Sequence, residues 1–138
     1  MATGVRNHEA PECRTHIFDR IMGRLTTHVL DTASGIPAQG MRVELHDLDL
    51  PRSVPLAGFC TNADGRGATP LLDEGAMRSG RFELRFHVAE YFRARGTALP
   101  DPPFLDVVVI RFGVADAAQH YHVPLLVSPW SYSTYRGS

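Results

Sequence analysis

Histidine and arginine side chains are the groups in this sequence best suited to chemistry. His120 and His122 open the closing stretch HYHVPLLVSPWSYSTYRGS, His28 lies in an early alternating run, and Arg66 follows a turn signal. An unperturbed imidazole has a pKa of about 6.5, which suits proton transfer at neutral pH. A single histidine is most often an ordinary solvent-facing or hydrogen-bonded residue, but two imidazoles on one sheet face could divide the base and acid roles of a catalysed reaction.

The closing stretch predicts a strand whose two faces differ. Strand side chains alternate between faces, which gives a core face of Tyr121, Val123, Leu125 and Val127. The opposite face then carries His120, His122, Pro124 and Leu126. Two imidazoles among apolar groups suit neither a core nor an ordinary solvent face. We expect a ligand, another subunit, or both to cover this face.

A zinc site is an alternative interpretation of the same histidines. His120 and His122 share one strand face and could chelate a metal, but a catalytic zinc needs a third protein ligand. His28 could supply that ligand from another strand. Other catalytic patterns are absent from the sequence, which has no G-x-S-x-G elbow, no P-loop and no dinucleotide-binding glycine pattern after a strand.

Arg66 directly follows Asn62-Ala63-Asp64-Gly65, a strong turn signal. An arginine in this position is most often an ordinary solvated charge. Its guanidinium fork equally suits a planar ligand that presents carbonyl and amide edges. Arg66 is therefore a candidate ligand-binding residue.

Short alternating runs predict strands along most of the chain. The predicted strands are 24–31, 41–46, 54–61, 81–88, 104–112 and the stretch from 120 onward, and 89–96 predicts a short helix closed by Gly96. Residues 113–118 predict a hairpin loop that returns the chain antiparallel into the closing strand. These elements indicate an all-β antiparallel sandwich of about six to eight strands and roughly 110 residues.

The first strand also has two unlike faces, because Leu25, Thr27 and Val29 alternate with a set that includes His28 and Leu30. If this strand and the closing strand share a sheet, His28 and His122 lie on one outer face, which predicts an oligomer interface. Residues 1–23 carry charge, Pro and Gly without a sustained period, so we expect a partly disordered N-terminal arm before a domain spanning 24–138.

Composition narrows the classes of partner that the protein could bind. The chain has 138 residues, 14 Lys and Arg against 15 Asp and Glu, and a formal charge of -1, which gives no electrostatic case for binding nucleic acid or an anionic membrane. No apolar run approaches the roughly 20 residues of a membrane span, and no secretory signal is evident. We expect a cytoplasmic protein with two free thiols, Cys13 and Cys60, of which Cys60 is predicted to be a small buried hydrophobe.

Four stretches together resemble the transthyretin-like 5-hydroxyisourate hydrolases of urate breakdown. They are LTTHVLDTASGIPA at 25–38, TNADGRGATPLL at 61–72, FRARG before PFLDVVVIRFGV, and the closing HYHVPLLVSPWSYSTYRGS. The terminal YRGS is the most specific of them, because the related hormone carrier lacks it. The resemblance implies a transthyretin-like antiparallel sandwich of seven or eight strands with one short helix, assembled as a homotetramer.

The resemblance also implies which residues act. Carried over position by position, it implies catalytic roles for His28, Arg66, His122 and Ser138, and substrate contacts from His28, Arg66, Tyr135, Arg136 and Gly137. The implied reaction hydrolyses the cyclic amide of 5-hydroxyisourate to 2-oxo-4-hydroxy-4-carboxy-5-ureidoimidazoline without a cofactor or metal. A non-enzymatic carrier that uses the tetramer channel for a small ligand is the alternative from another functional class.

Overall fold

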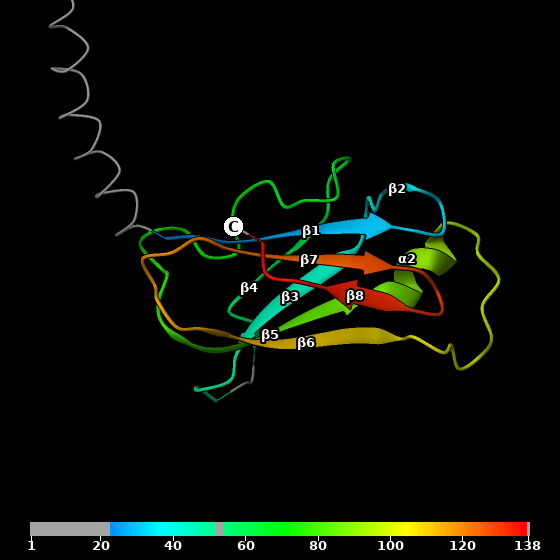
Figure 1. Ribbon diagram of the computed structural model, residues 1–138. Coiled ribbons are helices and arrows are strands. Elements are labelled where there is room, and N and C mark those ends of the chain that lie inside the picture. Colours follow the sequence, from blue (N-terminus) through cyan, green and yellow to red (C-terminus); the bar gives the residue numbers. More distant parts are fainter. Residues whose placement is uncertain (1–22, 52–53, 138) are drawn as a thin grey trace, which may run out of the picture.

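The computed structural model describes residues 23–51 and 54–137, and there the chain forms a sandwich of two four-stranded sheets (Figure 1). Their strand orders are β2-β1-β7-β8 and β4-β3-β5-β6. The elements are β1 (Leu25–Asp31), β2 (Ile36–Pro37), β3 (Arg42–Asp47), β4 (Ala57–Cys60), β5 (Gly80–His87), α2 (Val88–Ala94), β6 (Val107–Val114), β7 (Tyr121–Val127) and β8 (Tyr132–Thr134). The predicted sandwich of eight strands with one short helix is confirmed in this part of the chain. The predicted N-terminal arm and the predicted free thiol of Cys13 come before this part of the chain, so both stay predictions.

The core lies between the two sheets, where the alternating apolar residues meet. Fully buried side chains on the inner faces are Leu25 and Val29 of β1, Leu125 and Val127 of β7, and Phe82, Leu84 and Phe86 of β5. Each such side chain contributes roughly 1.5–3 kcal/mol of hydrophobic stabilisation on burial. This burial fixes which face of β1 and β7 points inward, and it leaves the opposite face of both strands, which carries His28 and His122, outside the core.

Helix α2 is fastened to the end of β1 by a buried hydrogen bond. The Tyr91 hydroxyl donates to Oδ2 of Asp31 over 2.9 Å, and the Asp31 residue is fully buried. Burial, reinforced by this carboxylate, raises the pKa of Tyr91 to about 12. As predicted, the chain leaves the helix through Gly96, whose φ of 86° lies in the left-handed region. The helix therefore closes one end of the sandwich (Figure 1).

The predicted hairpin between 104–112 and the closing strand is wrong. Strand β6 is an edge of one sheet, whereas β7 lies in the other sheet and pairs in parallel with β1, from Leu25 opposite Tyr121 to Asp31 opposite Val127. The loop between β6 and β7 therefore crosses from sheet to sheet. The Tyr121 hydroxyl holds this loop by accepting hydrogen bonds from the backbone N–H groups of Ala115 and Asp116, at 3.1 and 3.3 Å.

The prediction that Cys60 is buried is also wrong, because its thiol is free and exposed. Strand β4 is an edge strand paired only with β3 among the described residues, and Cys60 lies opposite Arg42 there. Ala57 and Phe59 pack against the core, so alternation turns Cys60 outward. The apolar run was long enough to suggest full burial, but in an edge strand every second side chain faces outward, and Cys60 is one of these.

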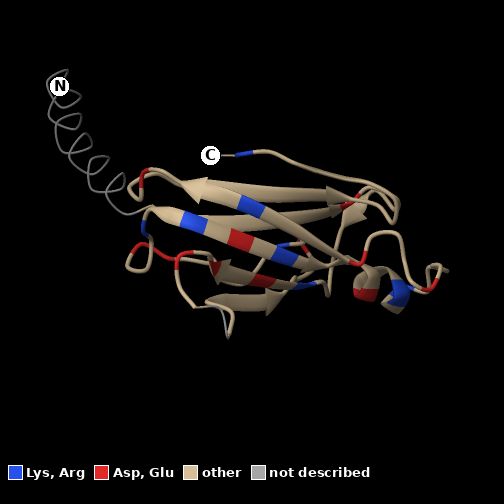
Figure 2. Ribbon diagram, turned by 90° about the horizontal axis from the view of Figure 1, so that it is seen from below, with Lys and Arg blue, Asp and Glu red and all other residues tan. Residues whose placement is uncertain are grey.

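Charged residues occupy the outer face of the sheet that contains β5, and acidic and basic positions alternate along a strand in Figure 2. On β5, Glu83 accepts a hydrogen bond from Arg85 Nε at 2.6 Å and another from Arg111 Nε of β6 at 3.0 Å. This face is an ion-pair network rather than a candidate for ligand chemistry. No helix in the described part of the chain is long and apolar enough to cross a membrane.

Candidate active site

The outer face of β1 and β7 brings together the two predicted catalytic histidines. Leu25, Thr27 and Val29 point into the core, which turns Thr26, His28 and Leu30 outward and leaves them half-buried. His122 of β7 is likewise half-buried on the outer face. The ring centroids of His28 and His122 lie 6.4 Å apart, and the two planes are tilted by 32°. The two rings are therefore close enough to contact one small ligand.

Arg66 reaches this pair from the turn that precedes it. Oδ1 of Asn62 accepts hydrogen bonds from the backbone N–H of Asp64 at 2.9 Å and of Arg66 at 3.2 Å. The N–H of Val29 donates to the carbonyl of Gly65 over 2.9 Å, which docks the turn on β1. Gly65 has a φ of +76°, and a Cβ there would lie 2.4 Å from the carbonyl oxygen of Val29. The turn therefore requires glycine in order to approach this closely.

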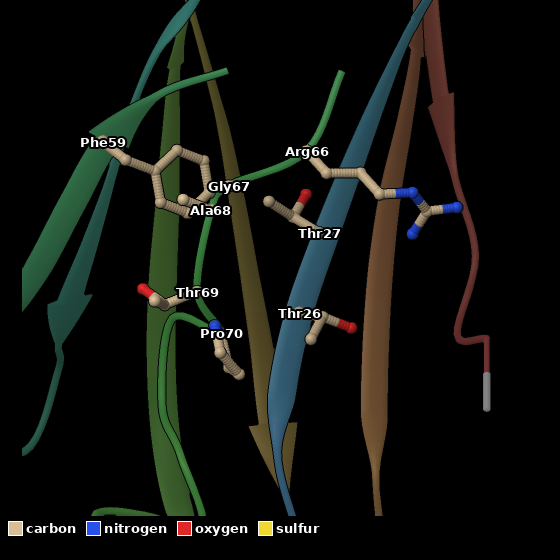
Figure 3. Close-up of a pocket in the computed structure, with 8 residues that line it drawn as sticks. All are labelled: Thr26, Thr27, Phe59, Arg66, Gly67, Ala68, Thr69 and Pro70. Carbon is tan, nitrogen blue, oxygen red and sulfur yellow. The ribbon is translucent and has the colours of Figure 1, made fainter. Parts of the chain in front are cut away.

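The Arg66 side chain extends across β1 toward β7 and the C-terminal segment (Figure 3). It lies at the edge of a hollow of about 190 Å³, whose other lining residues are Thr26, Thr27, Phe59, Gly67, Ala68, Thr69 and Pro70. Phe59 lies on the far side of the loop from the guanidinium (Figure 3). The guanidinium thus points toward β7, the strand that carries His122, and away from the aromatic wall of the hollow (Figure 3).

Burial and the nearby guanidinium keep both imidazoles neutral. Burial and then the charge of Arg66 lower the pKa of His28 from 6.5, against smaller opposing effects of a backbone hydrogen bond at Asp64 and of the Asp64 charge. Burial, then Arg66, then His28 lower the pKa of His122 from the same value. Neutral imidazoles at neutral pH can accept a proton, so this environment favours general base catalysis.

These directions predict the pH dependence of any reaction that needs neutral histidines. Each pKa is depressed, so the rings stay neutral until the pH falls below the ordinary value of 6.5. We expect kcat/KM to stay level from pH 8 down to about 6.5 and to fall only in more acidic solution, as the two rings titrate as a coupled pair. Initial rates across this range measure it. A decline that begins above pH 6.5 would contradict the prediction.

The C-terminal segment runs against His122. The N–H of Gly137 donates to the carbonyl of His122 over 2.7 Å, and the N–H of His122 donates to the carbonyl of Gly137 over 3.3 Å. A Cβ on Gly137 would lie 3.1 Å from Cδ2 of His122. The predicted substrate residues 135–137 therefore lie in a segment that pairs with β7 at His122, while Ser138 lies outside the described residues.

Of the three predicted contacts in this segment, Arg136 is engaged elsewhere. Its NH2 donates to the carbonyl of His120 at 3.0 Å and to Oε1 of Gln119 at 3.1 Å. Its guanidinium carbon also lies 4.2 Å from the ring centroid of Tyr121. Tyr135 is 60% exposed. In this arrangement Arg136 fastens the segment to the start of β7, and Tyr135 remains available to a ligand.

The close approach of Gly137 predicts a specific effect of substitution. Gly137→Ala forces the His122 ring to move by a few tenths of an ångström, because its added methyl group would lie 3.1–3.2 Å from ring and Cβ atoms. A misplacement of about 1 Å can cost a hundredfold in rate, so we expect kcat to fall by about tenfold. Gly75→Ala is the matched control, because its Cβ would make only an ordinary 3.6 Å contact with Asp73. Equal kinetics of the two variants would contradict the prediction.

The zinc interpretation gains no third ligand. Residues 23–51 and 54–137 contain no group of three or more His, Cys, Asp or Glu that could hold a metal ion. His120 is exposed and borders a small hollow of about 120 Å³, together with Arg24, Thr26 and His122. Here a threonine and an arginine stand where a metal site would need further imidazole or carboxylate ligands.

Sequence reasoning missed one residue of the site, Thr26. Its Oγ1 lies 2.8 Å from Nδ1 of His122. The alternation of the first strand already placed Thr26 on the same face as His28, but threonine is common in strands and carries no signal of its own. Only the parallel register, in which Thr26 lies opposite His122, reveals the contact.

Comparison with known proteins identifies relatives along almost the whole described chain. A sequence profile described as "HIUase/Transthyretin family" matches residues 25–137. A protein of Ralstonia nicotianae named 5-hydroxyisourate hydrolase is 59% identical over 117 residues, which are 85% of this chain and 100% of the relative. The proteins of that name from Pseudomonas aeruginosa and Mus musculus are 54% and 44% identical, over 85% and 83% of this chain and 93% and 94% of theirs.

Solved structures of related proteins also resemble this chain. Klebsiella pneumoniae 5-hydroxyisourate hydrolase matches with a TM-score of 0.69 at 32% identity, over 85% of this chain and 94% of that one. An (S)-allantoin synthase matches with a TM-score of 0.79 at 50% identity, over 84% of this chain but only 44% of its own length. Sea bream transthyretin in complex with thyroxine matches with a TM-score of 0.71 at 26% identity, over 83% of this chain and 94% of that one.

Proposed function

This chain belongs to the HIUase/transthyretin family and is a 5-hydroxyisourate hydrolase, and we propose that His28, Arg66 and His122 carry out its reaction on the outer face of β1 and β7. One observation supports this assignment above the others. The two histidine rings lie 6.4 Å apart, and the charge of Arg66 lowers the pKa of both. The Arg66 side chain extends across β1 toward β7 (Figure 3), which brings its guanidinium to the face that carries both rings.

Water is the nucleophile in the proposed reaction. A neutral imidazole of the pair removes a proton from water as it attacks a ring carbonyl of 5-hydroxyisourate. The carbon–nitrogen bond of the cyclic amide then breaks, and the proton that the first imidazole took from water passes by way of the second imidazole to the departing nitrogen, which leaves both rings neutral again. The product is 2-oxo-4-hydroxy-4-carboxy-5-ureidoimidazoline. The OH of the water becomes part of its new carboxyl group, and the remaining hydrogen becomes part of its new N–H. General acid–base catalysis of this kind contributes typically 10²–10⁴-fold.

Arg66 supplies the positive charge that this reaction needs. Its guanidinium donates hydrogen bonds to the substrate oxygen on which negative charge develops, and its planar fork matches the carbonyl and amide edges of the ring. Tyr135 contacts the substrate from the C-terminal segment, and Gly137 lets that segment lie close to His122. A catalytic role for Ser138, which lies outside the described residues, stays a prediction of the resemblance.

We also propose that the protein is a homotetramer in which other copies of the chain cover the outer face of β1 and β7. The support is apolar surface that one chain leaves exposed on the edge strands and the loops beside them, formed by Phe104, Val107, Val109, Trp130 and Tyr132. Strands β6 and β8 are each the outer strand of a sheet and lie beside each other in Figure 1, so their free edges can pair with a second copy. Light scattering coupled to size-exclusion chromatography gives the mass directly.

The proposed compartment is the cytoplasm. The exposed thiol of Cys60 is free, and free thiols persist in reducing compartments. Fractionation of cells that express the full chain, followed by immunoblotting against a cytoplasmic marker, tests this proposal.

The deciding experiment follows the ultraviolet decay of 5-hydroxyisourate freshly generated from urate by a urate oxidase. The substrate decays unaided, so each trace is compared with one that lacks the protein, and a chelator is present in both. Acceleration by substoichiometric protein is the expected result. A folded protein that binds the substrate one-to-one without accelerating its decay would be a carrier instead. Acceleration that appears only in a further pair of traces without the chelator would support the zinc interpretation.

A further inference from the structure

A hydrogen bond across the β1–β7 pair connects Thr26 to the His122 ring. Oγ1 of Thr26 lies 2.8 Å from Nδ1 of His122, and the parallel register places the two residues directly opposite each other. In Figure 3 the Thr26 hydroxyl points toward β7, on the same side as the Arg66 guanidinium. Thr26 is half-buried, so the contact is partly shielded from competing water.

The two nitrogens of the His122 ring therefore differ in their hydrogen bonding. Nδ1 has the Thr26 hydroxyl as its partner, whereas Nε2 has no hydrogen-bond partner among the described residues. The backbone of the same residue is held on its other side by the paired hydrogen bonds with Gly137. Rotation of the ring would break the Thr26 contact, so the ring presents one defined nitrogen to the space it shares with His28.

We propose that Thr26 is a positioning residue that holds the His122 ring through Nδ1, so that Nε2 is the nitrogen that exchanges a proton with water or substrate. This inference rests on the proposed catalytic role of His122. It goes further by naming Nε2 as the reacting atom of the His122 ring and Thr26 as the side chain, outside the predicted site, that determines this.

A hydroxyl is well suited to this task because it can both donate and accept. When Nε2 is free to take a proton, Nδ1 carries its own proton and donates to Oγ1 of Thr26. When Nε2 carries the proton of a neutral ring, the hydroxyl reverses and donates to Nδ1. One side chain therefore orients the ring as a base and as an acid.

A carboxylate in the same place would behave differently. It would stabilise the imidazolium and raise the pKa of the ring, and the ring would lose its ability to accept a proton at neutral pH. The uncharged threonine leaves the pKa of His122 lowered by burial and by Arg66. The choice of threonine is consistent with a ring that must return to the neutral state in each turnover.

The test compares Thr26→Val, which keeps the shape and loses the hydroxyl, with Thr26→Ser, which keeps the hydroxyl. We expect Thr26→Val to lower kcat by about tenfold, the typical effect of one lost hydrogen bond, with little change in KM, and Thr26→Ser to restore most of the rate. The acid limb of the pH profile should move to lower pH in Thr26→Val, since a hydroxyl accepts more strongly from an imidazolium than from a neutral ring.

Thr27→Val is the matched control. The Thr27 hydroxyl donates to the carbonyl of Val123 over 2.7 Å, so this variant also loses a threonine hydrogen bond across the same two strands. We expect it to lower the melting temperature and to leave the pH profile unchanged. A shift in the profile of Thr27→Val equal to that of Thr26→Val would mean that general loosening of the strands is responsible, and would overturn the proposal.

A spectroscopic measurement separates this proposal from the proposed function. In protein labelled with ¹⁵N-histidine, couplings between ring protons and ring nitrogens show which nitrogen carries the proton, and the His122 signals are those that disappear in His122→Gln. We expect the Nδ1 signal of His122 to shift in Thr26→Val and to stay in place in Thr26→Ser. An unchanged signal in Thr26→Val would overturn the inference even if the enzyme is active, and an inactive parent protein would overturn the function while leaving this readout intact.

Discussion

Replacing His122 with alanine is expected to lower kcat for 5-hydroxyisourate by roughly a hundredfold to ten-thousandfold, the usual contribution of a general acid or base. His28→Ala should have an effect in the same range, because the two rings face one another at 6.4 Å and the reaction needs both a proton acceptor and a proton donor. The double variant should lose little beyond either single one, since residues that act as a unit are not additive. Initial rates of ultraviolet decay, corrected for spontaneous decay, measure all three.

The matched control for these substitutions is His87→Ala. His87 is a half-buried histidine like His122, but it lies at the end of β5, and Glu44 on the outer face of that other sheet is 3.5 Å away. We expect it to keep parental kcat and KM. Unchanged turnover in His122→Ala, from protein with the parental melting temperature and mass, would remove His122 from the mechanism.

Arg66→Ala is expected to produce the second large loss, about a hundredfold to a thousandfold in kcat, which is typical when one group that stabilises an oxyanion is removed. Arg66→Lys should lie between the parent and this variant, because lysine keeps the charge but not the planar fork. The alanine variant should also move the acid limb of the pH profile upward, since Arg66 lowers the pKa of both His28 and His122. The lysine variant should retain more of the parental profile.

Arg93→Ala serves as the control for loss of a guanidinium. Arg93 is exposed near the end of α2 and donates a single hydrogen bond to the carbonyl of Pro100 at 3.3 Å. It should leave kcat and the pH profile unchanged. If Arg66→Ala raised KM alone and left both kcat and the acid limb in place, Arg66 would be a ground-state binding group without a role in the transition state.

The sequence was sufficient to predict the faces of the two strands that carry the histidines. Side-chain alternation has a period of two, and a run with large apolar residues at every second position can bury only one face. The pattern Leu25, Thr27, Val29 therefore forces His28 outward, and the pattern Tyr121, Val123, Leu125 does the same for His122. The structure confirms both assignments.

The pairing of strands could not be predicted in the same way. A loop of suitable length after β6 favoured a hairpin into β7, but nothing local in the sequence records that the chain crosses to the other sheet or that β7 runs parallel to β1. The contact between Thr26 and His122 depends on that register. The position of Arg66 depends on another contact between distant parts of the chain, the hydrogen bond from Val29 to the carbonyl of Gly65.

The β1–β7 pair also determines when activity arises during synthesis. Thr26 and His122 are separated by 96 positions in the sequence, and within the described residues β1 has only the two-residue β2 as another sheet partner. A nascent chain thus exposes β1 without its long neighbour until β7 has been made, and closing so large a loop slows folding. Polypeptides released early by the ribosome, before β7 is made, contain His28 and Arg66 but no complete site. Catalysis should therefore begin only after β7 has been synthesised and has paired with β1.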